Sequence, residues 1–387
     1  MFITLISLFP YYTIRDYLSE TETRMQLQPY GVSLLKKLKK LKDLQDIILQ
    51  NGIDAILITN IVNVQYLSGF TGSSGEIILT PTSAYLVVDG RYFQQAGDET
   101  HGFELIKRTK LLPDTLKDFF FPQHAIRRLG VEADHLSYHQ YQVFSSHLEF
   151  LQLIPTTGMI IRQRCIKSPE EVQKIRIACE IASKVYNKIL PMIKPGISEI
   201  DLLCELEYQI KKSNGQVAFE PIIASGIRSS LPHARASNKI IQDRDPILID
   251  WGARYEGYNC DITRVIIPDG VSPEFQKMYQ AVKQTHSQVI GMLKPGIRFE
   301  EMNEAGKNIL SQFGYEDFWL HKIGHGIGLE VHERLGSEDE VLLMPGMVIT
   351  IEPGAYIPQL GGARVEDTVL ITDDGCEVLS EGIVPYQ

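Results

Sequence analysis

Hydrophobic and polar positions in the first part of the chain alternate between helical and strand spacing. Leu and Lys recur at helical spacing over residues 31–51, and residues 54–59 then form a short apolar run that is typical of a buried strand. Two more apolar runs follow at residues 76–80 and 84–88. We therefore predict a smaller α/β domain over residues 31–165.

A second domain is predicted over residues 166–387. Ser168 can cap a helix, Pro169 suits the first helical position, and Glu170 and Glu171 suit the positive end of the helix dipole. A long helix is expected from this point to about Met192.

One segment of the second domain recurs. The sequence MIKPGI at residues 192–197 reappears as MLKPGI at residues 292–297. Helical patterns follow at 199–212 and 300–312, and each ends near a glycine that suits a helix C-terminus. Two such units, each followed by strand hairpins, predict a duplicated α+β architecture with pseudo-twofold symmetry.

The polarity pattern at residues 247–267 predicts an antiparallel hairpin, because two β-branched runs flank a polar centre. A turn centred between Tyr255 and Glu256 would place Asp250 directly opposite Asp261. Opposed carboxylates in an apolar setting repel each other, which favours a bound cation. The alternative is that both aspartates face solvent or cap turns.

Three histidines, His321, His325 and His332, lie in and beside a glycine-rich stretch. The first two have the four-residue spacing of a zinc-protease helix, but the glutamate of that motif is missing and the glycines disfavour a helix. We expect a loop or strand in which glycine allows close approach of the backbone.

A second acidic hairpin is predicted near the C-terminus. Glu352 ends an apolar strand before Pro353, and the returning strand carries Arg364 and Glu366 on one face. Four carboxylates and an imidazole on two hairpins are most simply explained by a site for two metal ions.

Composition sets the broad class. A chain of 387 residues with 44% hydrophobic and 22% charged residues is typical of a globular protein with two domains. The net charge of -10 argues against nucleic-acid binding. Five scattered cysteines disfavour a disulfide framework or a cysteine zinc site and indicate a reducing compartment, so we expect a cytoplasmic protein.

Two further segments need an interpretation. The apolar start at residues 1–12 has no basic flank and is too short to span a membrane, so residues 1–30 are interpreted as an N-terminal extension and no membrane partner is expected. Met25 offers an alternative start. The sequence YLSGFTGSSG at residues 66–75 lacks the spacing of phosphate-binding loops, and its glycines are interpreted as turn residues.

Taken in order, Asp250, Asp261, His325, Glu352 and Glu366 resemble the five ligands of the pita-bread (M24) metallopeptidases. The flanking GHGIGLEVHE and GGARVED segments share the resemblance, and YLSGFTGSSG with DGRY resembles the N-terminal domain of the Xaa-Pro peptidases. The resemblance implies a C-terminal pita-bread catalytic domain after a creatinase/prolidase-like N-terminal domain. It also implies a homodimer.

The resemblance also implies roles. Asp261 and Glu366 would bridge two divalent ions, Asp250 would hold one ion, and His325 with Glu352 would hold the other. Mn²⁺ is expected, with Co²⁺, Zn²⁺ or Fe²⁺ as alternatives. The ions would activate a bridging water, and Glu352 could accept its proton. Three groups of residues would act on the peptide: His233 and His332 on the oxyanion and departing amine, His321 in substrate binding, and Arg364 in substrate binding and in orienting Glu366.

The implied substrate is a proline-containing peptide cleaved at its N-terminal Xaa-Pro bond, as in aminopeptidase P. Some prolidases carry an arginine four residues after the equivalent of His332, suited to a dipeptide carboxylate. Here that position is Gly336, with Arg334 nearby, so the aminopeptidase is favoured over the dipeptidase. A methionine aminopeptidase and a non-catalytic peptide-binding relative are the remaining alternatives.

Overall fold

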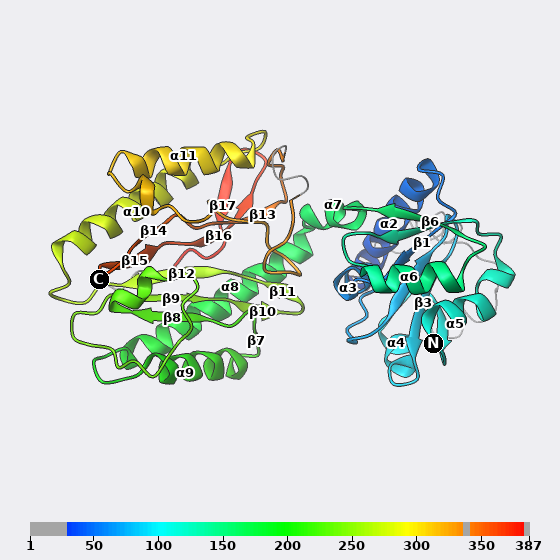
Figure 1. Ribbon diagram of the computed structural model, residues 1–387, viewed down its shortest axis with the longest axis horizontal. Helices are drawn as coiled ribbons and strands as arrows, with labels where there is room; N and C mark the ends of the chain where they lie inside the picture. The colour runs from blue at the N-terminus through cyan, green and yellow to red at the C-terminus, as the bar shows by residue number, and fades with distance from the viewer. Residues whose placement is uncertain (1–28, 336–340, 383–387) are drawn as a thin grey trace. The chain divides into compact units, whose positions relative to one another are not determined.

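The computed structural model describes residues 29–335 and 341–382. The expected N-terminal extension (1–30) therefore lies almost wholly outside the described residues, and Gly336 lies outside them too. The chain divides into two compact units, the first ending at Gln163 and the second beginning at Arg164 (Figure 1). Within the described ranges, no helix is both long and apolar enough to cross a bilayer.

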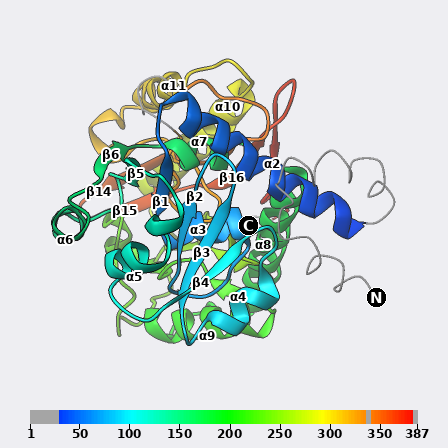
Figure 2. The same cartoon turned by 90° about the vertical axis from the view of Figure 1, so that its right-hand side faces the viewer.

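A six-stranded mixed sheet forms the centre of the first unit. Its strand order is β4-β3-β2-β1-β5-β6, which can be followed in Figure 2. The strands are β1 (Ala55–Ile58), β2 (Glu76–Leu79), β3 (Ala84–Asp89), β4 (Glu104–Arg108), β5 (Arg128–Glu132) and β6 (Gln152–Thr156). The helices are α2 (Pro29–Gln50), α3 (Ile61–Ser68), α4 (Phe93–Glu99), α5 (Leu112–Phe119) and α6 (Tyr138–His147). The helix and the three strands predicted from the hydrophobic pattern are confirmed as α2, β1, β2 and β3.

Gly69 confirms the interpretation of a turn glycine in residues 66–75, and Gly72 has a packing role that was not predicted. Gly69 ends α3 with φ 80°. At Gly72 a Cβ atom would lie 2.1 Å from the ring of Phe70, so the backbone passes directly against this buried ring.

In the second unit, helices cover the strands on two sides, with α8 and α9 on one and α10 and α11 on the other (Figure 1). These helices are α8 (Pro169–Ile189), α9 (Glu199–Lys212), α10 (Pro273–Met292) and α11 (Phe299–Ser311), after α7 (Met159–Cys165). The first half contains β7 (Gln216–Val217), β8 (Ile222–Ser225), β9 (Ile247–Trp251), β10 (Ala253–Tyr255), β11 (Tyr258–Asn259) and β12 (Ile262–Ile266). The second contains β13 (Val348–Ile351), β14 (Gly354–Ile357), β15 (Gly361–Arg364), β16 (Asp367–Ile371) and β17 (Cys376–Val378).

The duplicated architecture is confirmed by the hydrogen bonds of the two Pro-Gly turns. Gly196 and Gly296 both have positive φ, at 97° and 85°. The amide of Gly196 donates to the carbonyl of Ile241 at 3.1 Å, and that of Gly296 donates to Leu343 at 2.8 Å. The predicted capping of α8 is also confirmed, because Ser168 and Glu171 form a reciprocal capping box.

The register of the first hairpin differs from the prediction. Tyr255 pairs with Tyr258 around a two-residue loop, and Asp250 pairs with Thr263 instead of Asp261. The loop residues Glu256 and Gly257 both have positive φ, at 44° and 88°, as a type I′ turn requires. The prediction placed the turn one residue too early.

The two aspartates nevertheless share a face. Moving the turn centre by one residue changes each cross-strand partner by two, and side chains alternate faces with a period of two. Asp261 is therefore a diagonal neighbour of Asp250, on the same side of the hairpin as Thr263.

The second hairpin lies beside the first. β13 pairs with β16 and β14 with β15 in one continuous register, which places Glu352 opposite Glu366. The amide of Glu366 donates to the carbonyl of Thr263 at 3.2 Å and joins the two hairpins. Acidic residues from both hairpins therefore meet at one place.

Replacing Gly257 by Ala should lower the free energy of unfolding by about 1–2 kcal/mol, because an L side chain is strained at this left-handed position. Tryptophan fluorescence during urea unfolding is a suitable measurement, since both tryptophans, Trp251 and Trp319, lie in the second unit. Glu256→Asn is the control, because Asn-Gly suits a type I′ turn. An equal loss of stability in both variants would contradict this turn.

Candidate metal centre

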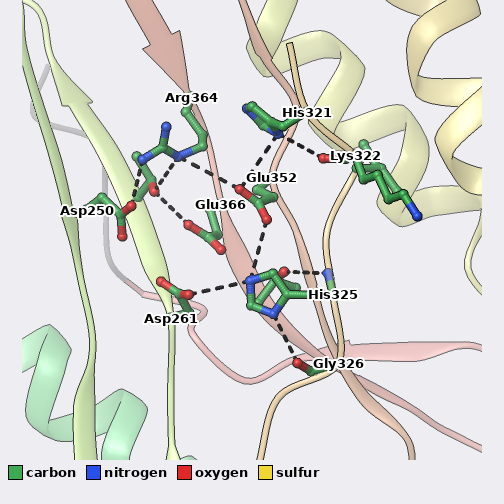
Figure 3. Close-up of polar contacts among 12 residues, drawn as sticks. Asp250, Asp261, His321, Lys322, His325, Gly326, Glu352, Arg364 and Glu366 are labelled. Carbon is green, nitrogen blue, oxygen red and sulfur yellow. Dashed lines mark hydrogen bonds and ion pairs between the residues drawn. The ribbon is translucent and has the colours of Figure 1, made fainter. Parts of the chain in front are cut away.

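Three side chains that can bind a metal converge where the hairpins meet. One ligand atom from each of Asp261, His325 and Glu366 lies within 4.8 Å of the other two (Figure 3). Asp261 directly precedes β12, Glu366 lies between β15 and β16, and His325 comes from the glycine-rich loop.

Glu352 and Asp250 lie in the same region (Figure 3). The Nε2 atom of His325 is 3.5 Å from Oε1 of Glu352 and 3.6 Å from Oδ2 of Asp261. Asp250 Oδ2 accepts a hydrogen bond of 2.6 Å from Nη2 of Arg364. The structure therefore brings together all five residues that the sequence singled out as ligands.

The orientation of His325 suits metal binding. Its Nδ1 lies 3.0 Å from the carbonyl of Gly326, which can only accept, so the proton belongs on Nδ1. The lone pair on Nε2 then points toward the carboxylates. Metal-bound imidazoles are commonly held in this way by a carbonyl on their other nitrogen.

Glycines hold the loop of His325 against its neighbours, as predicted. A Cβ on Gly324 would lie 2.0 Å from the carbonyl oxygen of Thr350 in β13, and one on Gly328 would lie 2.7 Å from Glu333. The buried carboxylate of Glu333 receives hydrogen bonds from Arg164 and Lys167 at 2.6 and 2.7 Å. This ion-pair cluster anchors the segment that carries the histidines.

Each of three acidic side chains has one buried oxygen that finds no hydrogen-bond partner among the residues that the structure describes. These atoms are Oδ1 of Asp250, Oδ1 of Asp261 and Oε1 of Glu366. Burying an unpaired carboxylate oxygen is costly, so a cation is the expected partner. Oxygen donors with one neutral imidazole are a ligand set that suits divalent ions such as Mn²⁺. The residues present therefore fit the metal site that the sequence implied.

Burial and the closeness of the carboxylates also shift the pKa values of the metal-free site. Burial, followed by repulsion from neighbouring carboxylates, raises the pKa values of Asp261 and Glu366 well above their usual range. Burial also raises the pKa of Glu352 to about 7, although Arg364 opposes this shift. The pKa of His325 falls to about 4, mainly because of burial, which keeps the imidazole neutral.

Arg364 connects several of these groups. Besides Asp250 it donates to Oγ1 of Thr263 at 3.0 Å, and Thr263 donates to Oε2 of Glu366 at 2.6 Å. The guanidinium therefore contacts Asp250 directly and reaches Glu366 through Thr263. The sequence interpretation overlooked Thr263, although its place two residues after Asp261 on one strand was a usable signal.

His321 is connected to this network by Tyr356, which the sequence interpretation also overlooked. The Tyr356 hydroxyl accepts from Arg364 Nη1 at 2.6 Å and lies 2.7 Å from His321 Nε2. His321 Nδ1 lies 2.8 Å from the carbonyl of Lys322, so Nδ1 carries the proton and Nε2 accepts from the tyrosine. The pKa of His321 is lowered to about 4, mainly by burial.

Two other histidines border the site and are exposed. The ring of His332 lies 4.3 Å from the ring of His325. His233 follows Pro232, whose carbonyl lies 3.5 Å from Nη1 of Arg364. The ring of His332 therefore lies beside a candidate metal ligand, and the backbone next to His233 lies beside Arg364.

Comparison with known proteins assigns the second unit to a family. The pattern described as metallopeptidase family M24 matches residues 173–373, which is more than half of the chain. The chain belongs to metallopeptidase family M24. Residues 40–166 match the creatinase/prolidase N-terminal domain. The family resemblance and the fold class, an α+β pita-bread domain after a smaller α/β domain, are therefore confirmed.

Similar proteins support the same assignment. The chain is 37% identical over 351 residues to an Xaa-Pro dipeptidase of Pyrococcus horikoshii, covering 89% of this chain and 97% of that protein. It resembles the structure of an Xaa-Pro dipeptidase from Bacillus anthracis with a TM-score of 0.86 and 34% identity, over 91% and 99% of the two chains. An X-Pro aminopeptidase structure from Thermotoga maritima matches with a TM-score of 0.82 and 33% identity, over 89% and 99%.

The metal-free protein should lose stability as the pH rises from about 6.5 to 8, a range above the ordinary pKa of histidine, because the lowered pKa values of His321 and His325 act in the opposite direction only between about 4 and 6.5. The pKa of Glu352 is about 7 in the folded state against an ordinary 4.5, so its stabilising contribution is present at low pH and is lost as it ionises. Asp261 and Glu366 act in the same direction. Urea unfolding of the chelated protein across this range measures the effect, and added Mn²⁺ should remove the decline. Stability that rises with pH would contradict the arrangement.

Replacing Asp261 by Asn should abolish metal-induced stabilisation and raise the stability of the metal-free protein at neutral pH, because one of the repelling carboxylates is removed. Metal content and melting temperature with and without Mn²⁺ are the measurements. Asp269→Asn, an exposed change after the same hairpin, is the control. Full metal occupancy in the Asp261 variant would show that the ligand assignment is wrong.

Proposed function

We propose that this chain binds two divalent ions between its acidic hairpins and hydrolyses the Xaa-Pro bond at the N-terminus of peptides. The observation that carries the proposal is the set of buried, unpaired carboxylate oxygens on Asp250, Asp261 and Glu366. The neutral His325, with its Nε2 lone pair directed at the same place, supports it further.

In this proposal the ligands divide between the two ions. Asp261 and Glu366 would be shared by both ions, Asp250 would help to hold one of them, and His325 with Glu352 would help to hold the other. Mn²⁺ is proposed as the metal, and Co²⁺, Zn²⁺ or Fe²⁺ could occupy the same donor set. Two-metal sites of this kind activate a water nucleophile and polarise a carbonyl group.

The surrounding side chains would handle protons and developing charge. Glu352, whose pKa is raised to about 7 without metal, would accept the proton of the attacking water. His233 and His332 would donate hydrogen bonds to the oxyanion and to the departing amine. His321 and Arg364 are assigned to the substrate side of the site, where Tyr356 holds His321 in one tautomer.

The specificity for proline rests on the relatives. The named relatives act on Xaa-Pro or X-Pro substrates. An Xaa-Pro bond is a tertiary amide without an N–H, so its cleavage requires a site that protonates the proline nitrogen. An imidazole such as His233 or His332 could supply that proton.

Aminopeptidase activity is proposed over dipeptidase activity because Gly336 stands where some prolidases carry an arginine for the dipeptide carboxylate. The dipeptidase is the second candidate, favoured by the names of two similar proteins and by the exposed Arg334 near His332. A homodimer and a cytoplasmic location stay predictions.

The metal-loaded protein should hydrolyse Xaa-Pro-Yaa tripeptides at least tenfold faster, by kcat/KM, than Xaa-Pro dipeptides, a difference of about 1.4 kcal/mol in the barrier. Product analysis with Mn²⁺ present measures both rates, and Xaa-Ala-Yaa and Met-Ala-Yaa peptides serve as controls. Faster cleavage of the dipeptides would favour the dipeptidase. No cleavage of either proline peptide by folded, metal-loaded protein would overturn the proposed function.

A further inference from the structure

A buried carboxylate outside the metal centre holds the loop that carries His233. Glu199 lies in the first turn of α9 and is fully buried at 0% exposure. The loop in question, here called the His233 loop, comprises residues 226–236. It begins after Ser225 at the end of β8 and returns to α9 at Ser237.

Both ends of the His233 loop are bound to the two oxygens of Glu199. Oε1 accepts from the amide and the hydroxyl of Ser225, each at 2.8 Å. Oε2 accepts from the amide of Ser237 at 3.1 Å and from its hydroxyl at 2.7 Å. One carboxylate therefore sets the separation between the two ends of the loop.

A third connection crosses the loop. Arg228 Nε lies 3.1 Å from Oε2 of Glu199, and its Nη2 donates to the carbonyl of Arg235 at 2.6 Å. The guanidinium therefore links Glu199 to a residue two positions after His233. Arg228 also supplies the positive charge that a buried carboxylate requires.

The far side of the His233 loop is fixed to the metal-site hairpin. Ser229 donates to the carbonyl of Gly226 at 2.7 Å and accepts from the amide of Gly362 in β15 at 2.9 Å. Gly362 stands two residues before Arg364, and a Cβ on it would lie 2.2 Å from the carbonyl oxygen of Ser229. The loop is thus held between α9 and the strand that carries Arg364.

The internal duplication provides a comparison for this carboxylate. The equivalent position of the second half is Phe299, a buried apolar residue in the first turn of α11. Its amide donates to the carbonyl of Val341 at 2.9 Å, as that of Glu199 donates to Lys239 at 3.1 Å. The same backbone connection therefore forms with or without a glutamate.

We infer that Glu199 is a positioning residue for catalysis, which holds the His233 loop against the strand that carries Arg364 and so positions His233. This inference rests on the proposed function, because it takes His233 to act on the substrate. Glu199 itself lies at the base of the loop and acts only through it.

Glu199→Gln is a sharp test because each carboxylate oxygen accepts one backbone N–H. Whichever way the glutamine amide turns, its NH₂ group faces the amide of either Ser225 or Ser237, and one of these donors loses its acceptor. We expect kcat to fall by about 10- to 100-fold, since small misplacements of a catalytic group have effects of this size. KM and metal content should be unchanged.

Two controls separate this role from general destabilisation. Glu205→Gln makes the same change on the same helix, where the side chain accepts a hydrogen bond from Gln209, and should leave kcat unchanged. Ser237→Ala removes the hydroxyl hydrogen bond to Glu199 and the one that the same hydroxyl accepts from the amide of Lys239, but it keeps the carboxylate. It should lower kcat by a few fold, and it keeps the test available if Glu199→Gln does not fold.

Hydrogen exchange and a double-mutant cycle complete the experiment. Exchange should accelerate within residues 226–237 in Glu199→Gln, and in a His233→Ala background the glutamine change should cause no further loss of kcat. Full additivity of the two losses, or unchanged exchange in the loop, would overturn the inference. Full activity of His233→Ala would instead overturn the role proposed for His233. The hydrogen-exchange measurement would still show whether Glu199 holds the loop, because it does not depend on activity.

Discussion

This site depends on one constraint, the repulsion among buried carboxylates. Two hairpins bring these carboxylates together in the interior. Asp250, Asp261 and Glu366 are buried, and Glu352 faces them from the opposite strand position. Arg364 supplies one positive charge, yet three oxygens keep no partner. Such an arrangement is costly without cations, and it becomes a strong binding site when divalent ions balance the charge.

The residues around the carboxylates keep them in place but balance only part of their charge. Thr263 accepts a hydrogen bond from Arg364 and donates one to Glu366. Tyr356 connects the same arginine to His321. The glycines of the loop around His325 allow β13 and Glu333 to approach its backbone. Rigid support of this kind is what a metal site needs, because ligand geometry must be set before the ions arrive.

The duplication of the second unit explains how two hairpins come to face each other, while differences between the halves provide the chemistry. The Pro-Gly turns and their hydrogen bonds repeat almost residue for residue. At the start of the following helix, however, one half has Glu199 and the other has Phe299. Glu199 bonds both ends of the His233 loop, whereas the segment that carries His325 and His332 in the second half is anchored by the ion pairs of Glu333.

The sequence by itself determined the elements, the cap of α8, the internal repeat and the shared face of Asp250 and Asp261, because these depend on periodicity and on residues a few positions apart. The hairpin register depended on the left-handed backbone of Glu256 and Gly257. The sequence prediction centred the turn one residue too early, and it therefore paired the wrong residues across the two strands. Other contacts join residues that are far apart in the chain. They are the hydrogen bond of Thr263 to Glu366, the ion pair of Arg364 with Asp250, and the hydrogen bonds of Glu199 with two serines. Only the tertiary structure decided these contacts, since no local pattern encodes which distant side chain will meet another once the halves pack together.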